Sequence, residues 1–232
     1  MEPADRYSET RPARIAVFDF DGTLISGQSG ALLSRYLLSR GYLSPSQVTR
    51  LGWWGIRYVL HLPKRQEEPR EIIFSGFAGC GAAEVRAVMD DFYEKVLVKR
   101  LRPRAVEEVN RRLGDGCVTL LVSATFEDIA ARAAEDMRFD GYVATEMRLD
   151  QDGRYTGEVE GEVVAGLGKR HAVERWADAR FGRGRWIVDY AYGDHYSDCD
   201  LLVEAANPYA VSPGHTLKRT AQRLDWPIVD WK

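Results

Sequence analysis

Apolar and polar residues follow two different periods along this chain. Short runs of apolar, β-branched residues are typical of buried strands, and apolar residues that recur every three or four positions indicate helices with one buried face. The short runs predict strands at residues 15–18, 118–122, 142–149, 154–160, 186–188 and 228–229. The helical spacing predicts helices from residue 103 onward and at 127–135, 173–181 and 213–224. This alternation indicates an α/β fold, a Rossmann-like doubly wound parallel sheet.

One long segment breaks the alternation. From about residue 30 to residue 100 only the helical spacing occurs, with helices expected near 30–40, 46–62 and 85–97. Residues 150–153 (DQDG) separate two expected strands and predict an antiparallel hairpin. The expected division is a flexible N-terminal tail (1–13), a core domain (14–27 and 101–232) and an inserted helical cap domain (28–100).

The charge balance excludes one group of partners. The chain has 232 residues, 45% of them hydrophobic, with 32 basic and 35 acidic side chains and a formal net charge of −3. We expect a globular protein with a substantial core and no overall field that would draw it onto nucleic acid or an anionic membrane. Any anionic ligand must therefore be bound locally.

The sequence pattern predicts neither secretion nor membrane insertion. Residues 1–14 lack the basic start and apolar run of a signal peptide, and the most apolar long stretch, 51–62, is far shorter than a spanning helix. The three cysteines lie far apart and have no metal-ligand spacing, which fits a reducing compartment. We therefore expect a cytoplasmic protein without a transmembrane segment.

The first chemically distinctive segment is residues 19–23 (DFDGT), directly after the first expected strand. In an extended chain the carboxylates of Asp19 and Asp21 project to the same side, which suits a nucleophile and its proton-transfer partner. Gly22 and Thr23 allow a tight turn whose backbone N–H groups can face a phosphate. Taken alone, an Asp-x-Asp pair is equally often a pair of loop-capping residues.

Further polar residues follow later strands, where a doubly wound sheet collects its ligand-binding groups. Ser123 follows one strand, and Asp194 and Asp198 follow another. Lys169 opens a helix, so its ammonium group and the positive helix end could act on one anion. Carboxylates at several strand ends suggest a hard, oxygen-ligated cation. Individually, Ser123 could be a strand-end hydroxyl, Lys169 a solvated residue and Asp198 a helix cap.

Together these residues resemble the four ordered motifs of the haloacid dehalogenase (HAD) superfamily of phosphatases. The resemblance covers nearly the whole chain from residue 15 to residue 230. The helical insertion resembles the C1-type cap of the phosphoserine phosphatase-like subfamily IB, and residues 204–211 and 226–230 are also similar to that subfamily. His195 departs from the pattern, because relatives usually have a small Ser or Gly at that place.

The resemblance implies a role for each motif. Asp19 would attack phosphorus, Asp21 would act first as general acid and then as general base, and Lys169 would neutralise charge in the transition state. The implied phosphate-binding residues are Gly22, Thr23, Ser123, Ala124 and Lys169. The implied Mg²⁺ site consists of the Asp19 carboxylate, the Asp21 backbone carbonyl, Asp194, and Asp198 as a ligand or directly behind the ligands.

The motifs contain nothing that could recognise the leaving group, so we expect the cap to select the substrate. Candidate selecting residues are Arg57, His61 and His195, with Arg57 first because a guanidinium group can bind a carboxylate with two hydrogen bonds. The aromatic cluster at Trp53 and Trp54 also fits a simpler reading, the packed face of a cap helix.

The expected activity is Mg²⁺-dependent hydrolysis of a small organic phosphomonoester through an aspartyl-phosphate on Asp19. The resemblance implies a phosphoserine-like or other amino-alcohol phosphate as substrate. One alternative is a lipid-head-group phosphatase or a phosphotransferase of the same superfamily, since residues 51–62 could lie on a membrane surface. The other is a catalytically silent phosphate-binding or partner-binding module, which would have no need for Asp21.

Overall fold

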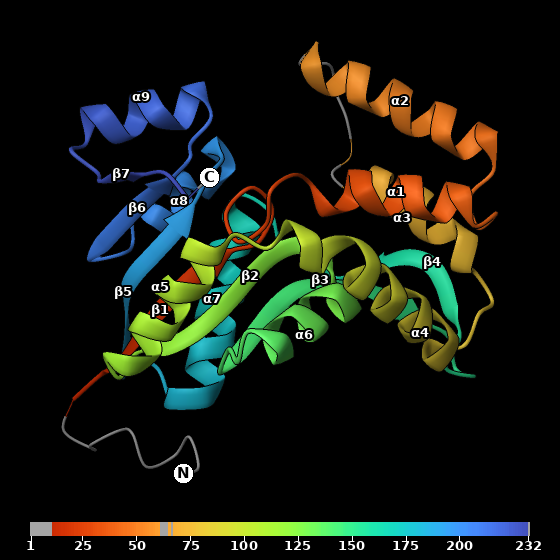
Figure 1. Cartoon of the computed structure of the whole chain (residues 1–232). Helices are drawn as coiled ribbons and strands as arrows, with labels where there is room; N and C mark the ends of the chain where they lie inside the picture. The colour runs from red at the N-terminus through yellow and green to blue at the C-terminus, as the bar shows by residue number, and fades with distance from the viewer. Residues whose placement is uncertain (1–10, 61–64, 66, 232) are drawn as a thin grey trace.

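The computed structural model describes residues 11–60, 65 and 67–231, and its centre is one mixed sheet flanked by helices (Figure 1). Within these residues the sheet has seven strands in the order β4-β3-β2-β1-β5-β6-β7. All neighbouring pairs are parallel except β3 and β4. The strands are β1 (Ala13–Asp19), β2 (Val118–Phe126), β3 (Gly141–Leu149), β4 (Tyr155–Glu160), β5 (Trp186–Gly193), β6 (Asn207–Val211) and β7 (Ile228–Val229).

The strand order changes direction at β1. After β1 the chain builds β2, β3 and β4 on one side of it, and then returns to build β5, β6 and β7 on the other side. The crevice at the carboxyl end of such a strand is the usual ligand site of an open α/β sheet, because the flanking connections diverge there. Asp19 is the last residue of β1, opposite Val122 of β2 in the parallel register.

Helices cover both faces of the sheet because alternate side chains of β1 are apolar on both sides. Ile15 and Val17 belong to one buried cluster, together with α7, α8 and α9. Ala16 and Phe18 belong to the other, together with α5 and α6. A central parallel strand that is buried on both faces is expected to read as a continuous apolar run. These helices are α5 (Pro103–Gly114), α6 (Glu127–Asp136), α7 (Leu167–Phe181), α8 (Cys199–Leu202) and α9 (His215–Arg223).

The segment between β1 and α5 is helical in all its named elements. These are α1 (Ser29–Ser39), α2 (Pro45–Val59), α3 (Glu68–Phe74) and α4 (Ala82–Phe92), with short 3₁₀ and π turns after α3 and α4. Figure 1 shows α1 between α2 and the sheet, with α2 outermost. Among the described residues no helix has the length and apolar character needed to cross a lipid bilayer.

The helical segment is anchored on the antiparallel extension formed by β3 and β4. The ring of Phe74 packs against Phe126 of β2 and Tyr155 of β4, with centroids 4.7 and 4.9 Å apart. One continuous apolar cluster therefore includes residues of the segment and residues of the sheet. The division into a core domain and a cap domain accordingly stays a prediction.

The predicted fold class is confirmed, and the differences have local causes. The doubly wound sheet and the hairpin at 150–153 are both present. The sequence analysis missed β6, because Pro208, its second residue, cannot donate a ladder hydrogen bond and so breaks the strand pattern. It also missed α3, a short helix whose first turn is a polar stretch around Pro69.

A buried polar network joins α5 to β5 next to the crevice. The Tyr192 hydroxyl donates to Glu108 Oε1 at 2.6 Å and accepts from Arg112 Nε at 2.9 Å. The Tyr192 ring stacks on Phe18 of β1, with centroids 4.4 Å apart. Because both rings lie at the ends of their strands, this stack supports the two loops that leave the sheet there.

We expect Tyr192→Phe to lower the free energy of unfolding by about 1–2 kcal/mol, because two buried charged groups lose their shared hydroxyl. Urea unfolding followed by circular dichroism measures this loss. Tyr196→Phe is the matched control, since Tyr196 is exposed. Equal losses in the two variants would contradict a stabilising role for the buried network.

Candidate active site

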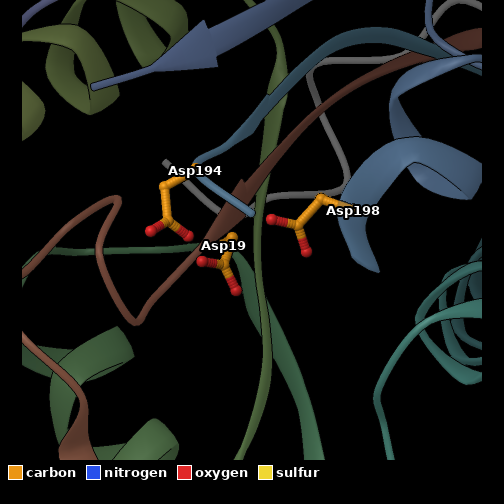
Figure 2. Close-up of side chains that lie close together, drawn as sticks. All are labelled: Asp19, Asp194 and Asp198. Carbon is orange, nitrogen blue, oxygen red and sulfur yellow. The ribbon is translucent and has the colours of Figure 1, made fainter. Parts of the chain in front are cut away.

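Three carboxylates from different segments gather at the carboxyl end of β1, as Figure 2 shows. Asp19 ends β1, Asp194 directly follows β5, and Asp198 ends a short 3₁₀ turn (Tyr196–Asp198). One oxygen of each lies within 4.8 Å of the others. Lys169, in the first turn of α7, donates to Asp19 Oδ1 at 2.5 Å and to Asp198 Oδ1 at 2.6 Å.

The loop after β1 is shaped by a glycine that no other residue could replace. Gly22 has a φ of +80°, and a Cβ atom there would lie 2.0 Å from Asp194 Oδ2. The Gly22 N–H donates to the Gly27 carbonyl at 3.1 Å, and the Thr23 hydroxyl donates to Asp19 Oδ2 at 3.1 Å. Gly22 and Thr23, two of the predicted phosphate-binding residues, thus lie in the loop and help to order it.

The electrostatics of this group are dominated by burial and by an excess of carboxylates. Burial raises the pKa of Asp19 well above its ordinary value; the nearby Lys169 opposes this, and Asp198 and Asp194 add to it. Burial and the neighbouring Asp198 raise the pKa of Asp194 to about 7. Burial alone would lower the pKa of Lys169, but its two carboxylate partners outweigh it and raise this pKa.

The donor set fits a magnesium ion. Three buried or partly buried carboxylates face one ammonium group, so the site carries surplus negative charge, and their oxygens are the hard ligands that Mg²⁺ prefers. Asp198 accepts from the Lys169 ammonium with Oδ1 and from the His195 backbone N–H with Oδ2. Asp198 thus takes part in the cap at the start of its own 3₁₀ turn, and its side chain makes no cap hydrogen bond to α8, the following helix that the sequence suggested it could cap.

Asp21 points away from the other carboxylates. Its Oδ1 accepts from the Ser29 N–H at 2.6 Å, and its Oδ2 lies 2.9 Å from Ser29 Oγ, at the start of α1. Burial raises the pKa of Asp21, although the hydrogen bonds from Ser29 oppose the shift. A carboxyl group with a raised pKa that faces a cavity is better suited to donate a proton to a ligand there than an ordinary carboxyl group.

The predicted residues of the second motif are also at this end of the sheet. Ser123 is buried directly beyond Val122, the β2 residue paired with Asp19, and its Oγ accepts from the Thr125 N–H at 3.1 Å. The Ala124 carbonyl accepts from Arg70 Nε at 2.8 Å. The second motif is therefore tied to the helical segment by Arg70.

A cavity of about 310 Å³ lies beside Asp21, between the sheet and the helical segment. Its polar lining includes Gln28, Ser34 and Arg70, and its apolar walls include Leu51 and Trp54. Its described lining residues include one cation, Arg70, and one carboxylate, Asp21. A ligand that extends from phosphate near Asp19 past Asp21 would enter this cavity.

The sequence analysis missed Arg70. Burial lowers its pKa to about 10, and the charges of Asp21 and Glu67 oppose this shift. Arg70 lies in the stretch Glu67-Glu-Pro-Arg-Glu71, which reads as a solvated charged segment. Only its position next to Pro69 at the start of a helix could have marked it.

Of the predicted substrate-selecting residues, the two that the structure describes do not line this cavity. Arg57 donates to Glu68 at 3.2 Å and faces a separate charged groove with Arg148 and Glu158. His195 is exposed, and its Nδ1 lies 2.9 Å from Ser197 Oγ as part of a local cap. His61 lies outside the described residues.

Two curated proteins similar to this chain are named as phosphatases. Phosphoserine phosphatase SerB1 of Mycobacterium tuberculosis is 26% identical over 99% of this chain and 74% of its own length. A histidinol-phosphatase of Neisseria meningitidis is 24% identical over 94% of this chain and 99% of its own length.

The solved structures give the same picture of the fold. A protein of unknown function from Bordetella pertussis has a TM-score of 0.84 and 28% identity, over 95% of this chain and all of that one. A phosphoserine phosphatase with an analogue of its phospho-aspartyl intermediate has a TM-score of 0.63 and 19% identity, over 96% and 95%. The haloacid dehalogenase-like hydrolase family matches residues 16–202, so the chain belongs to this family, and the predicted phosphoserine phosphatase-like phosphoric monoester hydrolase is confirmed.

Proposed function

We propose that this chain is a cytoplasmic, Mg²⁺-dependent phosphatase that forms an aspartyl-phosphate on Asp19 and hydrolyses a small phosphomonoester. One observation carries the proposal: the Asp19 carboxylate is bound to the Lys169 ammonium inside a group of further carboxylates, while Asp21 faces a separate cavity. The nucleophile and the proton donor thus have different surroundings, which suits their different tasks.

The residues would act in two steps. Asp19 attacks phosphorus, and the bond to the leaving oxygen breaks as Asp21 donates a proton to that oxygen. Asp21 then removes a proton from water, whose oxygen attacks the phosphoryl group and frees Asp19. The phosphoryl oxygens are held by Lys169 and the Ser123 hydroxyl, with backbone support from Gly22, Thr23 and Ala124. This positioning and neutralisation of charge are the main protein contributions to phosphoryl transfer.

Magnesium would be held by the carboxylates of Asp19 and Asp194 and by the Asp21 backbone carbonyl. Asp198 would orient Lys169 and stand beside the ion. The ion supplies positive charge that screens the phosphate from the surrounding carboxylates.

The leaving group would be bound in the cavity beside Asp21. Arg70 favours a substrate with a carboxylate, such as a phosphoserine-like ester, because a guanidinium group pairs best with a planar anion. An ester with an aromatic ring, such as histidinol phosphate, is a second candidate, since Trp54 and Phe126 also line the cavity. The similarity to SerB1 and to the Neisseria histidinol-phosphatase supports the two candidates about equally. A lipid-head-group ester and transfer to an acceptor other than water remain the rival reactions.

We expect Asp19→Asn to reduce phosphatase turnover by roughly 10⁴-fold or more, because an amide cannot form the covalent intermediate. Hydrolysis of p-nitrophenyl phosphate with Mg²⁺ measures the loss, and EDTA should silence the wild type equally. The control is Asp200→Asn, an exposed carboxylate in α8, which should keep full activity. Turnover that survives in Asp19→Asn would end the covalent mechanism.

We expect the metal-free protein to lose stability as pH rises from about 4 to 7. The folded-state pKa of Asp194 is about 7, against 3.8 ordinarily, so folding favours its protonated form and ionisation destabilises the fold. Asp194→Asn should remove about 2 kcal/mol of this loss, a value discounted for partial exposure. Thermal melts in EDTA across this pH range measure it, and Asp200→Asn should behave like the wild type. If the melting temperatures of all three proteins changed with pH in the same way, Asp194 would not be the source of the lost stability.

We expect Arg70→Ala to lower kcat/KM for L-phosphoserine by roughly 10- to 150-fold, which corresponds to about 1.5–3 kcal/mol for a hydrogen bond to a charged group. Phosphoethanolamine lacks the carboxylate, so its hydrolysis should change only a few-fold. Arg57→Ala is the control, because Arg57 pairs with Glu68 outside the cavity.

Equal losses on both substrates would assign Arg70 to support of the Ala124 carbonyl instead. Faster hydrolysis of histidinol phosphate, with no effect of Arg70→Ala, would select the second candidate.

A further inference from the structure

The outer face of α2 is apolar and exposed. Trp53, Ile56 and Leu60 have exposed fractions of 58%, 51% and 61%, and their spacing of three and four residues puts them in one stripe. The opposite face of the helix contains Leu51 and Trp54, which line the cavity of the candidate active site. Among the described residues, the packed side chains of α2 thus lie on its inner face, and the three residues of the outer stripe stay largely exposed. Clustered exposed apolar residues of this kind usually mark an interaction site.

The charge of the surrounding segment indicates the partner. Residues 22–66 contain six basic residues and no acidic one, which leaves 26 basic against 35 acidic residues in the rest of the chain. Arg50 is exposed on α2 and Arg35 on the neighbouring α1, whereas Arg40, directly after α1, pairs with Asp91, and Arg57 pairs with Glu68. An otherwise acidic protein therefore has a basic region centred on its outermost helix.

We propose that the outer face of α2 docks on an anionic lipid bilayer surface. A helix with a Trp-containing apolar stripe and basic flanks lies naturally in the plane of the membrane interface, where its apolar side chains enter the acyl boundary and its cations remain among the headgroups. This docking is peripheral, and it does not depend on the substrate proposed above.

Two other partners fit the same surface less well. In a symmetric dimer the same surface of each copy meets its counterpart. The basic residues around α2 of one copy would then face those of the other copy and repel them. A nucleic acid would use the cations but would leave the apolar stripe in water, since recognition of the duplex backbone depends on charge. A bilayer uses both features at once.

Vesicle co-sedimentation tests the proposal with the full chain. We expect binding to vesicles of phosphatidylcholine mixed with phosphatidylglycerol, weaker binding in high salt, and little binding to phosphatidylcholine alone. The triple variant Trp53→Ser/Ile56→Ser/Leu60→Ser should bind roughly tenfold more weakly or worse, because three exposed side chains no longer enter the interface. Arg50→Gln should weaken binding to a smaller degree.

The matched control replaces exposed apolar residues elsewhere, in the variant Ile187→Ser/Val203→Ser/Leu224→Ser, which should bind like the wild type. Circular dichroism establishes that all variants are folded. No wild-type binding to anionic vesicles, or equal binding by the α2 triple variant, would overturn the proposal. So would self-association of the wild type in light scattering that the α2 triple variant loses, since a second copy would then be the partner.

Discussion

The site depends on one electrostatic constraint, the burial of several carboxylates beside a single ammonium group. Lys169 donates to Asp19 and Asp198 at the carboxyl end of β1, and Asp194 adds a third negative group. Surplus charge away from water is costly, and the cost appears as the raised pKa of Asp194. A hard cation relieves this repulsion and then helps to bind an anionic phosphate. The feature that destabilises the metal-free protein would thus also be the source of the proposed affinity for metal and phosphate.

Glycines make this close approach possible. A Cβ on Gly22 would overlap the Asp194 carboxylate, and a Cβ on Gly193 would lie 2.7 Å from Asp198 Cβ. Two loops can therefore bring acidic side chains into one small volume without steric conflict. Below them, the stacked rings of Phe18 and Tyr192 fix the strand ends from which these loops begin. The packing of these two rings thus keeps the two loops in place, and the loops keep the mutually repelling carboxylates close together.

The sequence predicted the site residues that lie at the ends of regular strands and helices, and it missed the residue whose place depends on how the helices pack. Asp19 and Lys169 are 150 residues apart, yet both could be predicted because each is tied to the end or start of a periodic element. Arg70 could not, because its place in the cavity depends on how α3 packs against β2. Arg57 was the first candidate from the sequence, but in the structure it pairs with Glu68, eleven residues later, and does not line the cavity. Strand β6 was not predicted because it contains Pro208, and proline is normally excluded from the pattern of a strand.

The two tasks of the site depend on different parts of the fold. The carboxylates around Lys169 are positioned by β1, β5 and α7, whereas the cavity beside Asp21 takes one wall from Leu51 and Trp54 of α2. A change in the position of α2 would therefore alter the fit of the leaving group and leave the phosphate chemistry intact. Among the described elements, α2 has its main contacts with α1 and α3, so its position is set by the helical segment, whereas the carboxylates around Lys169 are positioned by the sheet and α7. The substrate is consequently the property of this enzyme that its motifs constrain least.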